Sequence, residues 1–211
     1  MKRALLAFLT LGFLSVALAR DCASEASLAA YAGLGSAGCT VVIGQGTVVN
    51  FSNFQLLSSS LTGSGLTLSA QSGSDYAGFT VNNAGSLGSP VVFSYDVNIL
   101  TGSLDTASFG FEGSSGVSME EDLLQAAGIT PEIGGPIVAS GVVSAPNTPQ
   151  AVTFSPEIDN FAVRDTIVFG SPGDLSSFED GFAAPEPGTF ALAGLALAGL
   201  GLLKRRLASK R

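Results

Sequence analysis

The sequence predicts an all-β domain, an antiparallel β-sandwich of jelly-roll type, between two flanking segments that serve export. Apolar and polar residues alternate along short segments, and clusters of Gly, Ser, Asn and Pro separate these segments. Short strands at this spacing are typical of antiparallel sandwiches. An apolar run near each end of the chain limits the domain to residues 20–183.

A secretory signal peptide is predicted at residues 1–19. Lys2 and Arg3 supply its positive charge, and residues 4–16 form a short apolar stretch. Ala17-Leu18-Ala19 matches the small-x-small pattern, so cleavage is predicted after Ala19. An uncleaved membrane anchor is the weaker interpretation, because the apolar run is shorter than the roughly 20 residues that a span requires.

Residues 20–183 form one strongly acidic domain. They hold sixteen acidic residues against the two cations Arg20 and Arg164, a net charge of −14. A surface of this sign repels nucleic acid and anionic lipid headgroups, and it attracts divalent cations or basic partners. We therefore expect no nucleic acid partner.

Cys22 and Cys39 are predicted to form a disulfide. An even number of cysteines in an oxidising compartment favours this pairing. The bond would tie the start of the mature domain to the first predicted strand and stabilise it by about 3 kcal/mol. The alternatives are free thiols or half of a metal site, but the chain has no histidine to complete such a site.

The strand pattern is clearest in residues 90–99 and 161–169, where alternate positions are apolar. Asp165 falls on the apolar face of the second segment. We expect a β-bulge that turns its side chain outward, and the alternative is a buried, paired carboxylate. Weaker alternation predicts further strands at 39–43, 47–54, 65–70, 76–81, 107–111, 137–143 and 150–154.

One helix is predicted at residues 119–127. Ser118 and Glu121 match a capping box, the apolar residues that follow share a stripe, and Gly128 with Pro131 ends the pattern. This helix would lie in a long connection between strands.

The residue types exclude most catalytic chemistry. Histidine is absent from the chain and lysine from residues 20–183, which excludes Ser-His-Asp, Cys-His and lysine-based catalysis. A carboxylate pair of the kind that glycosidases use remains. Its candidates are Glu112, Glu120, Glu121 and Asp122. Solvated acids at a helix start are the simpler interpretation, so we predict that the domain is not an enzyme.

Calcium is the metal that these residues favour, because only oxygen ligands are present. Two groups of acids could contribute: Glu120-Glu121-Asp122, and Asp174 with Glu179-Asp180. Neither group matches a spaced loop such as the EF-hand. No cofactor is assigned on this pattern, and calcium remains the metal to test.

The segment 184–211 is predicted to be a membrane-directed tail. It begins with Pro185-Glu186-Pro187-Gly188, continues as an apolar segment at 189–203, and ends in a basic tip that starts with Lys204-Arg205-Arg206. A buried core helix is the alternative. The absence of a polar face and the flanking cations favour a single transmembrane helix with its tip in the cytoplasm.

This order of motif, apolar helix and basic tip resembles the PEP-CTERM sorting domain of Gram-negative bacteria that produce exopolysaccharide. The resemblance implies processing by exosortase, an integral membrane protease-transpeptidase, with the helix as a temporary tether in the inner membrane. Residues 31–39, 51–54 and 163–167 also resemble a recurring type of PEP-CTERM surface protein with two N-terminal cysteines and a β-rich body. Neither resemblance supplies an activity.

We therefore expect a non-enzymatic protein of the cell surface or extracellular matrix. Exosortase and the Sec machinery would be its partners during export, and exopolysaccharide a partner afterwards. A glycan-binding module of the same fold is the alternative, and a carboxylate-dependent glycan hydrolase is a third interpretation. The chain has no tryptophan to form a flat sugar-binding platform, and its tyrosines are Tyr31, Tyr76 and Tyr95.

Overall fold

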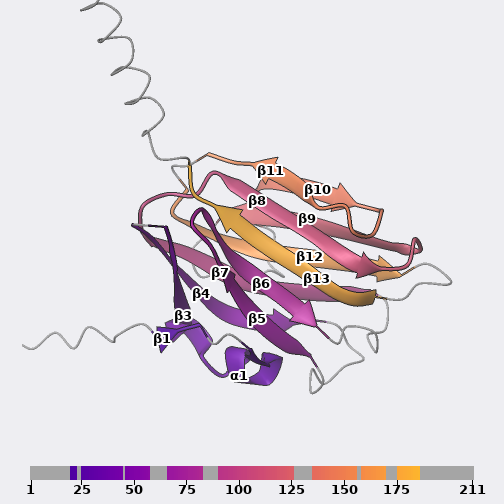
Figure 1. Ribbon diagram of the computed structural model, residues 1–211, viewed down its shortest axis with the longest axis horizontal. Coiled ribbons are helices and arrows are strands. Elements are labelled where there is room, and N and C mark those ends of the chain that lie inside the picture. Colours follow the sequence, from indigo (N-terminus) through magenta and orange to yellow (C-terminus); the bar gives the residue numbers. More distant parts are fainter. Residues whose placement is uncertain are drawn as a thin grey trace, which may run out of the picture.

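The computed structural model describes residues 20–22, 25–44, 46–57, 66–82, 90–125, 135–155, 158–169 and 175–185. This part of the chain forms a sandwich of two β-sheets (Figure 1). The strand pairs are antiparallel, apart from the short parallel pair of β1 (Arg20–Asp21) and β3 (Cys39–Ile43). The predicted all-β sandwich is therefore confirmed.

The seven-stranded sheet has the order β1-β3-β4-β7-β12-β9-β10. Its remaining strands are β4 (Thr47–Leu56), β7 (Val91–Thr101), β12 (Asn160–Phe169), β9 (Val117–Gln125) and β10 (Ile137–Val143). The six-stranded sheet has the order β11-β8-β13-β6-β5-β2. Its strands are β11 (Gln150–Thr153), β8 (Thr106–Gly113), β13 (Leu175–Ala183), β6 (Tyr76–Asn82), β5 (Thr67–Ser72) and β2 (Ala26–Ser27).

The two lateral sides of the sandwich are covered differently. On one side, the helix α1 (Leu28–Ala32) and the short 3₁₀ helix η1 (Gly35–Ala37) lead from β2 to β3 (Figure 1). The Ser27 hydroxyl caps α1 by accepting a hydrogen bond from the Ala30 amide at 3.2 Å, and Leu28 and Tyr31 are buried beneath it. On the other side, the edge strands β10 and β11 lie side by side.

The core lies between the sheets and is rich in aromatic residues. Period-two alternation turns one face of each central strand inward, because successive side chains of a strand point to opposite faces. Phe79 on β6 illustrates the packing: its ring contacts those of Tyr31, Phe51 and Phe54 edge-on, at centroid distances of 5.5, 4.8 and 5.2 Å. These contacts join the two sheets.

The predicted strands are confirmed, with ends that differ by a few residues. The predicted helix at 119–127 is wrong, since residues 117–125 form strand β9. β9 pairs with β12 on one side and with β10 on the other. This tertiary pairing overrides the helical preference of the local Met, Glu and Leu residues.

The expected β-bulge at Asp165 is also wrong. β12 pairs in unbroken register with both neighbours, and Asp165 lies opposite Phe93 on β7 and Glu121 on β9. Without an extra residue in the strand, alternation keeps Asp165 on the inner face. The alternative, a buried, paired carboxylate, is correct about burial, because Asp165 has no exposed surface, but its neighbours are two further carboxyl groups and not a cation.

Candidate functional site

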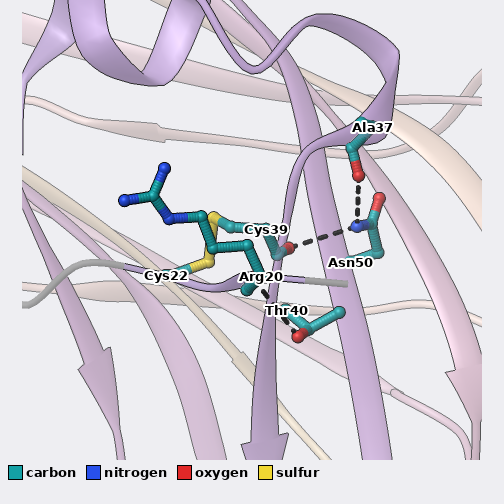
Figure 2. Close-up of a disulfide and its surroundings, with 6 residues drawn as sticks. All are labelled: Arg20, Cys22, Ala37, Cys39, Thr40 and Asn50. Carbon is teal, nitrogen blue, oxygen red and sulfur yellow. Dashed lines mark hydrogen bonds between the residues drawn. A yellow bond between two sulfur atoms is a disulfide. The ribbon is translucent and has the colours of Figure 1, made fainter. Parts of the chain in front are cut away.

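The predicted disulfide between Cys22 and Cys39 is confirmed (Figure 2). Their Cα atoms lie 4.8 Å apart, where the chain pairs with the start of β3. The Cys22 amide donates to the Thr40 carbonyl at 3.0 Å. The bond therefore ties the start of the domain to the first long strand, as its position predicts.

Asn50 on β4 supports the same region from the next strand. Its side-chain amide donates to the carbonyl oxygens of Ala37 at 3.1 Å and Cys39 at 3.3 Å (Figure 2). These bonds hold the turn before β3 against β4. The disulfide end of the domain is therefore a structural clamp.

Three acidic side chains meet inside the sandwich. Glu121 on β9 and Asp165 on β12 are cross-strand partners on the inner face of the seven-stranded sheet. Asp180 on β13 faces them from the opposite sheet, where it lies between Phe79 and Phe109 in the strand register. One carboxylate oxygen from each residue lies within 4.8 Å of the other two. We call these three residues the acid cluster.

The acid cluster is buried and poorly compensated. Glu121 and Asp165 have no exposed surface, and Asp180 is 3% exposed. The Tyr95 hydroxyl donates to one oxygen of Asp180 at 3.3 Å. In the described part of the chain no backbone amide, hydroxyl or cation reaches the other Asp180 oxygen or the carboxylate oxygens of Glu121 and Asp165, which leaves the carboxyl groups of the cluster as partners for one another.

No cation of the domain offsets the cluster's charge from within. Arg164 belongs to the outer face of β12, where its guanidinium pairs with Asp122 of β9 at 2.5 Å. Arg20 lies exposed in β1 at the edge of the sheet. The interior therefore holds three carboxyl groups that need protons or a bound ion to become neutral.

Burial shifts the titration of all these groups toward the neutral form. Burial raises the pKa of Asp180 to about 7. Hydrogen bonds that Asp165 and Glu121, when protonated, and Tyr95 donate to the Asp180 carboxylate lower this pKa in part. Burial first, and then repulsion from Asp180, raises the pKa of Asp165 and of Glu121 well above the usual range. Burial likewise raises the pKa of the Tyr95 hydroxyl.

The predicted calcium groups do not form sites as they stand in the sequence. In Glu120-Glu121-Asp122, strand alternation sends Glu121 inward and its two neighbours to the outer face. Glu179 and Asp180 are separated in the same way, and Asp174 lies outside the described residues. One residue of each group, Glu121 and Asp180, instead meets Asp165.

The candidate catalytic carboxylates are distributed over both sheets. Glu112 lies on the outer face of β8, where its carboxylate accepts a hydrogen bond from the Ser177 hydroxyl at 3.4 Å. Glu120 is exposed on β9, Asp122 pairs with Arg164, and Glu121 is inside the core. These four residues do not converge on one cleft.

A polar groove crosses the outer face of the six-stranded sheet. It consists of a hollow of about 470 Å³ over β6, β8 and β13 and a second of about 260 Å³ beside it, and both are lined by Thr80 and Glu179. The polar side chains along the two hollows are Gln71, Tyr76, Thr80, Asn82, Ser108, Glu112, Asn147, Thr148, Ser177 and Glu179. We call this feature the sheet groove.

Glycines form the floor of the sheet groove. Gly78, Gly110 and Gly181 lie on its three central strands, so backbone takes the place of side chains there. A Cβ on Gly78 would come within 1.9 Å of the Asp180 carbonyl oxygen, which shows how closely the strands approach. Tyr76 lines one end, with 44% of its surface exposed. Sequence alternation alone does not reveal this groove, because the strand order brings its residues together.

The sorting tail leaves the domain directly after β13. Ala184 donates its amide to the Asp75 carbonyl at 3.0 Å, and Pro185 is the last described residue. The other predicted motif residues, Glu186, Pro187 and Gly188, and the predicted span and basic tip lie outside the described residues, as does the predicted signal peptide. Among the helices that the structure describes, none is long and apolar enough to cross a membrane.

The fold and its surface features define a two-sheet β-sandwich with a polar groove on one sheet. Residues 183–206 match the family described as the PEP-CTERM protein-sorting motif. The chain thus carries a PEP-CTERM sorting motif at these residues, and the predicted motif is confirmed.

Comparisons of the whole chain with curated proteins and with solved structures give no further family assignment. No curated protein matches it. Among solved structures, the chain is similar to TmCBM61 in complex with β-1,4-galactotriose, with 11% identity and a TM-score of 0.35 over 63% of this chain and 87% of the other. It is also similar to CBM4, with 14% identity and a TM-score of 0.30 over 65% of this chain and 87% of the other. The sandwich assignment rests on the strand pairing described above.

Proposed function

We propose that this protein is exported and that its sandwich binds a neutral extracellular glycan through the sheet groove, without catalysing a reaction. The sorting motif at residues 183–206 makes the chain an exported substrate of exosortase. The Sec machinery would export it, residues 1–19 would be removed as the signal peptide, and the tail would tether it until processing. Its place of action would be the bacterial surface or exopolysaccharide matrix.

The single observation that carries the binding proposal is the sheet groove. Hydroxyl, amide and carboxylate groups converge along it over exposed, glycine-rich backbone. Such groups can exchange hydrogen bonds with the many hydroxyls of a sugar chain. Tyr76 offers a partly exposed ring at one end, against which a sugar face can pack. The groove is open rather than closed, as a polymer requires.

Charge restricts the glycan. The exported segment carries a net charge of −14, and Glu112 and Glu179 line the groove itself. Uronic acid and sulfate groups would be repelled, whereas neutral sugars can donate hydroxyl protons to these carboxylates. The proposed ligand is therefore a neutral polysaccharide.

The exposure of Glu112 and Glu179 supports the proposal that the sheet groove binds a glycan without cleaving it. A glycosidase needs a carboxyl group that an apolar environment keeps protonated. Both groove carboxylates are instead exposed on the sheet face. This environment favours a binding role.

Glycan binding is tested with the full-length protein on an array of neutral and acidic polysaccharides. We expect selective binding to neutral chains, and a loss of about three- to tenfold in affinity for each of Asn82→Ala and Glu179→Ala, as removal of one or two hydrogen bonds predicts. Glu120→Ala is the matched control, because it removes an exposed carboxylate from the other sheet. Binding that Glu120→Ala and Glu179→Ala reduce equally would contradict the proposal, as would no binding at all.

Processing is tested separately by intact-mass analysis of the protein extracted from the cell surface. The expected mature chain begins at Arg20 and lacks Lys204-Arg205-Arg206. A surface form that still carries this basic tip would contradict exosortase processing.

A further inference from the structure

The acid cluster places more negative charge in the core than the surrounding residues can balance. Glu121, Asp165 and Asp180 come from three strands and point into one space between the two sheets. The surrounding core is apolar and aromatic, as the neighbouring Phe93, Phe109 and Phe178 show. A carboxylate in such surroundings is unstable unless it is paired, protonated or bound to an ion.

The second observation concerns hydrogen bonding. Both carboxylate oxygens of Glu121 and both of Asp165 are fully buried, and among the described residues no donor outside the acid cluster reaches them. Buried polar atoms nearly always have partners, so carboxyl groups that direct one oxygen each into a common space need shared protons or a bound ion. The Tyr95 hydroxyl donates to Asp180 instead.

The spacing of the three side chains suits a metal ion. One oxygen of each residue lies within 4.8 Å of the others. Two oxygens that each lie about 2.4 Å from a shared calcium ion are at most about 4.8 Å apart. The three oxygens are therefore close enough for one calcium ion to contact all of them after small side-chain adjustments.

We propose that Glu121, Asp165 and Asp180 bind one Ca²⁺ ion in the interior of the sandwich, where the ion holds the two sheets together. The ion would neutralise two of the three carboxylate charges, and the hydrogen bond from Tyr95 offsets part of the third. It would join β9 and β12 of one sheet to β13 of the other.

The ligand chemistry selects calcium over other common ions. All three ligands are carboxylates, which suit hard cations, and the domain has neither histidine nor a free cysteine for zinc or copper. Magnesium retains several of its waters, whereas this site is closed by protein on all sides. Calcium accepts a shell made of protein oxygens, with up to two from each carboxylate.

The proposal is tested by thermal unfolding of the full-length protein, first after treatment with a chelator and then with added calcium. We expect the melting temperature to rise by about 5–10 °C when calcium exceeds its dissociation constant a hundredfold. Magnesium at the same concentration should raise it by less than half as much. Elemental analysis of the calcium-loaded protein should find one calcium per chain.

Three isosteric variants locate the ion: Glu121→Gln, Asp165→Asn and Asp180→Asn. Each should lose most of the calcium-induced rise, whereas Glu120→Gln, the exposed neighbour on the same strand, should keep it. An equal response of Glu120→Gln and Glu121→Gln would overturn the proposal, because it would place the ion on the acidic surface. The wild-type measurement needs no variant to fold: no calcium in the elemental analysis and no rise in melting temperature would also overturn it.

Discussion

Two regions of the same core differ in the side chains that join the sheets. Around β4, β6 and β7 the sheets meet through aromatic rings, and Phe79 has no exposed surface. Around β9, β12 and β13 they also meet through Glu121, Asp165 and Asp180, beside aromatic pairs such as Phe161 and Phe182. Tyr95 lies at the boundary, since its ring contacts Phe54 at 5.5 Å and its hydroxyl donates to Asp180.

The difference shows what each region depends on. Aromatic packing depends on buried area and shape, which change little with pH or ions. The stability of the acid cluster depends on whether protons or an ion neutralise it. One half of the core should therefore be insensitive to solution conditions, and the other half should respond to them.

The largest expected effect comes from removing a central ring of the aromatic half. Phe79→Ala should lower the free energy of unfolding by about 3–5 kcal/mol, because it removes buried contacts and leaves a cavity. Most of this loss should remain at acidic and neutral pH and with or without calcium, although Phe79 lies opposite Asp180 in the strand register. Urea denaturation under these conditions checks this, and a loss that disappears when calcium is removed would contradict the distinction between the two regions.

Removal of the disulfide should have the next largest effect. Replacing both Cys22 and Cys39 by Ser should lower stability by about 3 kcal/mol, since the unfolded chain is no longer constrained. The bond lies at the aromatic end, where Cys39 pairs with Phe51. Chemical denaturation of the double variant should show the same response to calcium as the wild type, and a lost response would connect the two regions.

The pH dependence of the calcium-free protein sharpens the comparison. Burial raises the pKa of Asp180 to about 7, so its folded state favours the protonated carboxyl. The stability that protonated Asp180 contributes is fully present below the pKa of an unfolded Asp, about 4, and is lost as the pH rises through the folded pKa of about 7. We expect the free energy of unfolding to decline by up to about 1.4 kcal/mol per pH unit for each proton lost between these two pKa values.

Denaturation between acidic and neutral pH, with a chelator present, measures this decline. Asp180→Asn should flatten it, because the variant has no proton to lose at that position. A wild-type stability that rises over the same window would contradict the burial of the cluster.

The smallest effect is expected on the outer faces. Glu120→Gln should change stability by less than about 0.5 kcal/mol, as is typical of an exposed position without specific contacts. Urea denaturation of Glu120→Gln and Glu121→Gln compares the two positions directly, because the residues are adjacent on β9 but lie on opposite faces of the sheet. Similar shifts in both would show that Glu121 is not inside the core.

Much of the fold follows from the sequence because alternation is a local signal. Residues 39–43 and 137–143, for example, are strands with the predicted bounds. The disulfide follows from an even cysteine count, and the PEP-CTERM tail from its motif order. The local pattern of β9 predicts a helix because Met119, Glu120 and Leu123 favour helices, and only its pairing with β10 and β12 makes it a strand.

The candidate sites could not be derived in the same way. Asp165 and Asp180 lie in different sheets, so their meeting depends on how the two layers pack. Local alternation does not predict β13, because its pairing with β8 shifts register near Ser177 and interrupts the regular pattern. The sheet groove depends on the order of β8, β13 and β6, which local patterns do not specify.

A crystal structure of the calcium-loaded protein, with anomalous scattering data, tests the contrast between the two halves most directly. The account predicts an anomalous peak between β9, β12 and β13, at about 2.3–2.6 Å from oxygens of Glu121, Asp165 and Asp180. An interior without such a peak, in which the three carboxyl groups share protons in short hydrogen bonds, would contradict it.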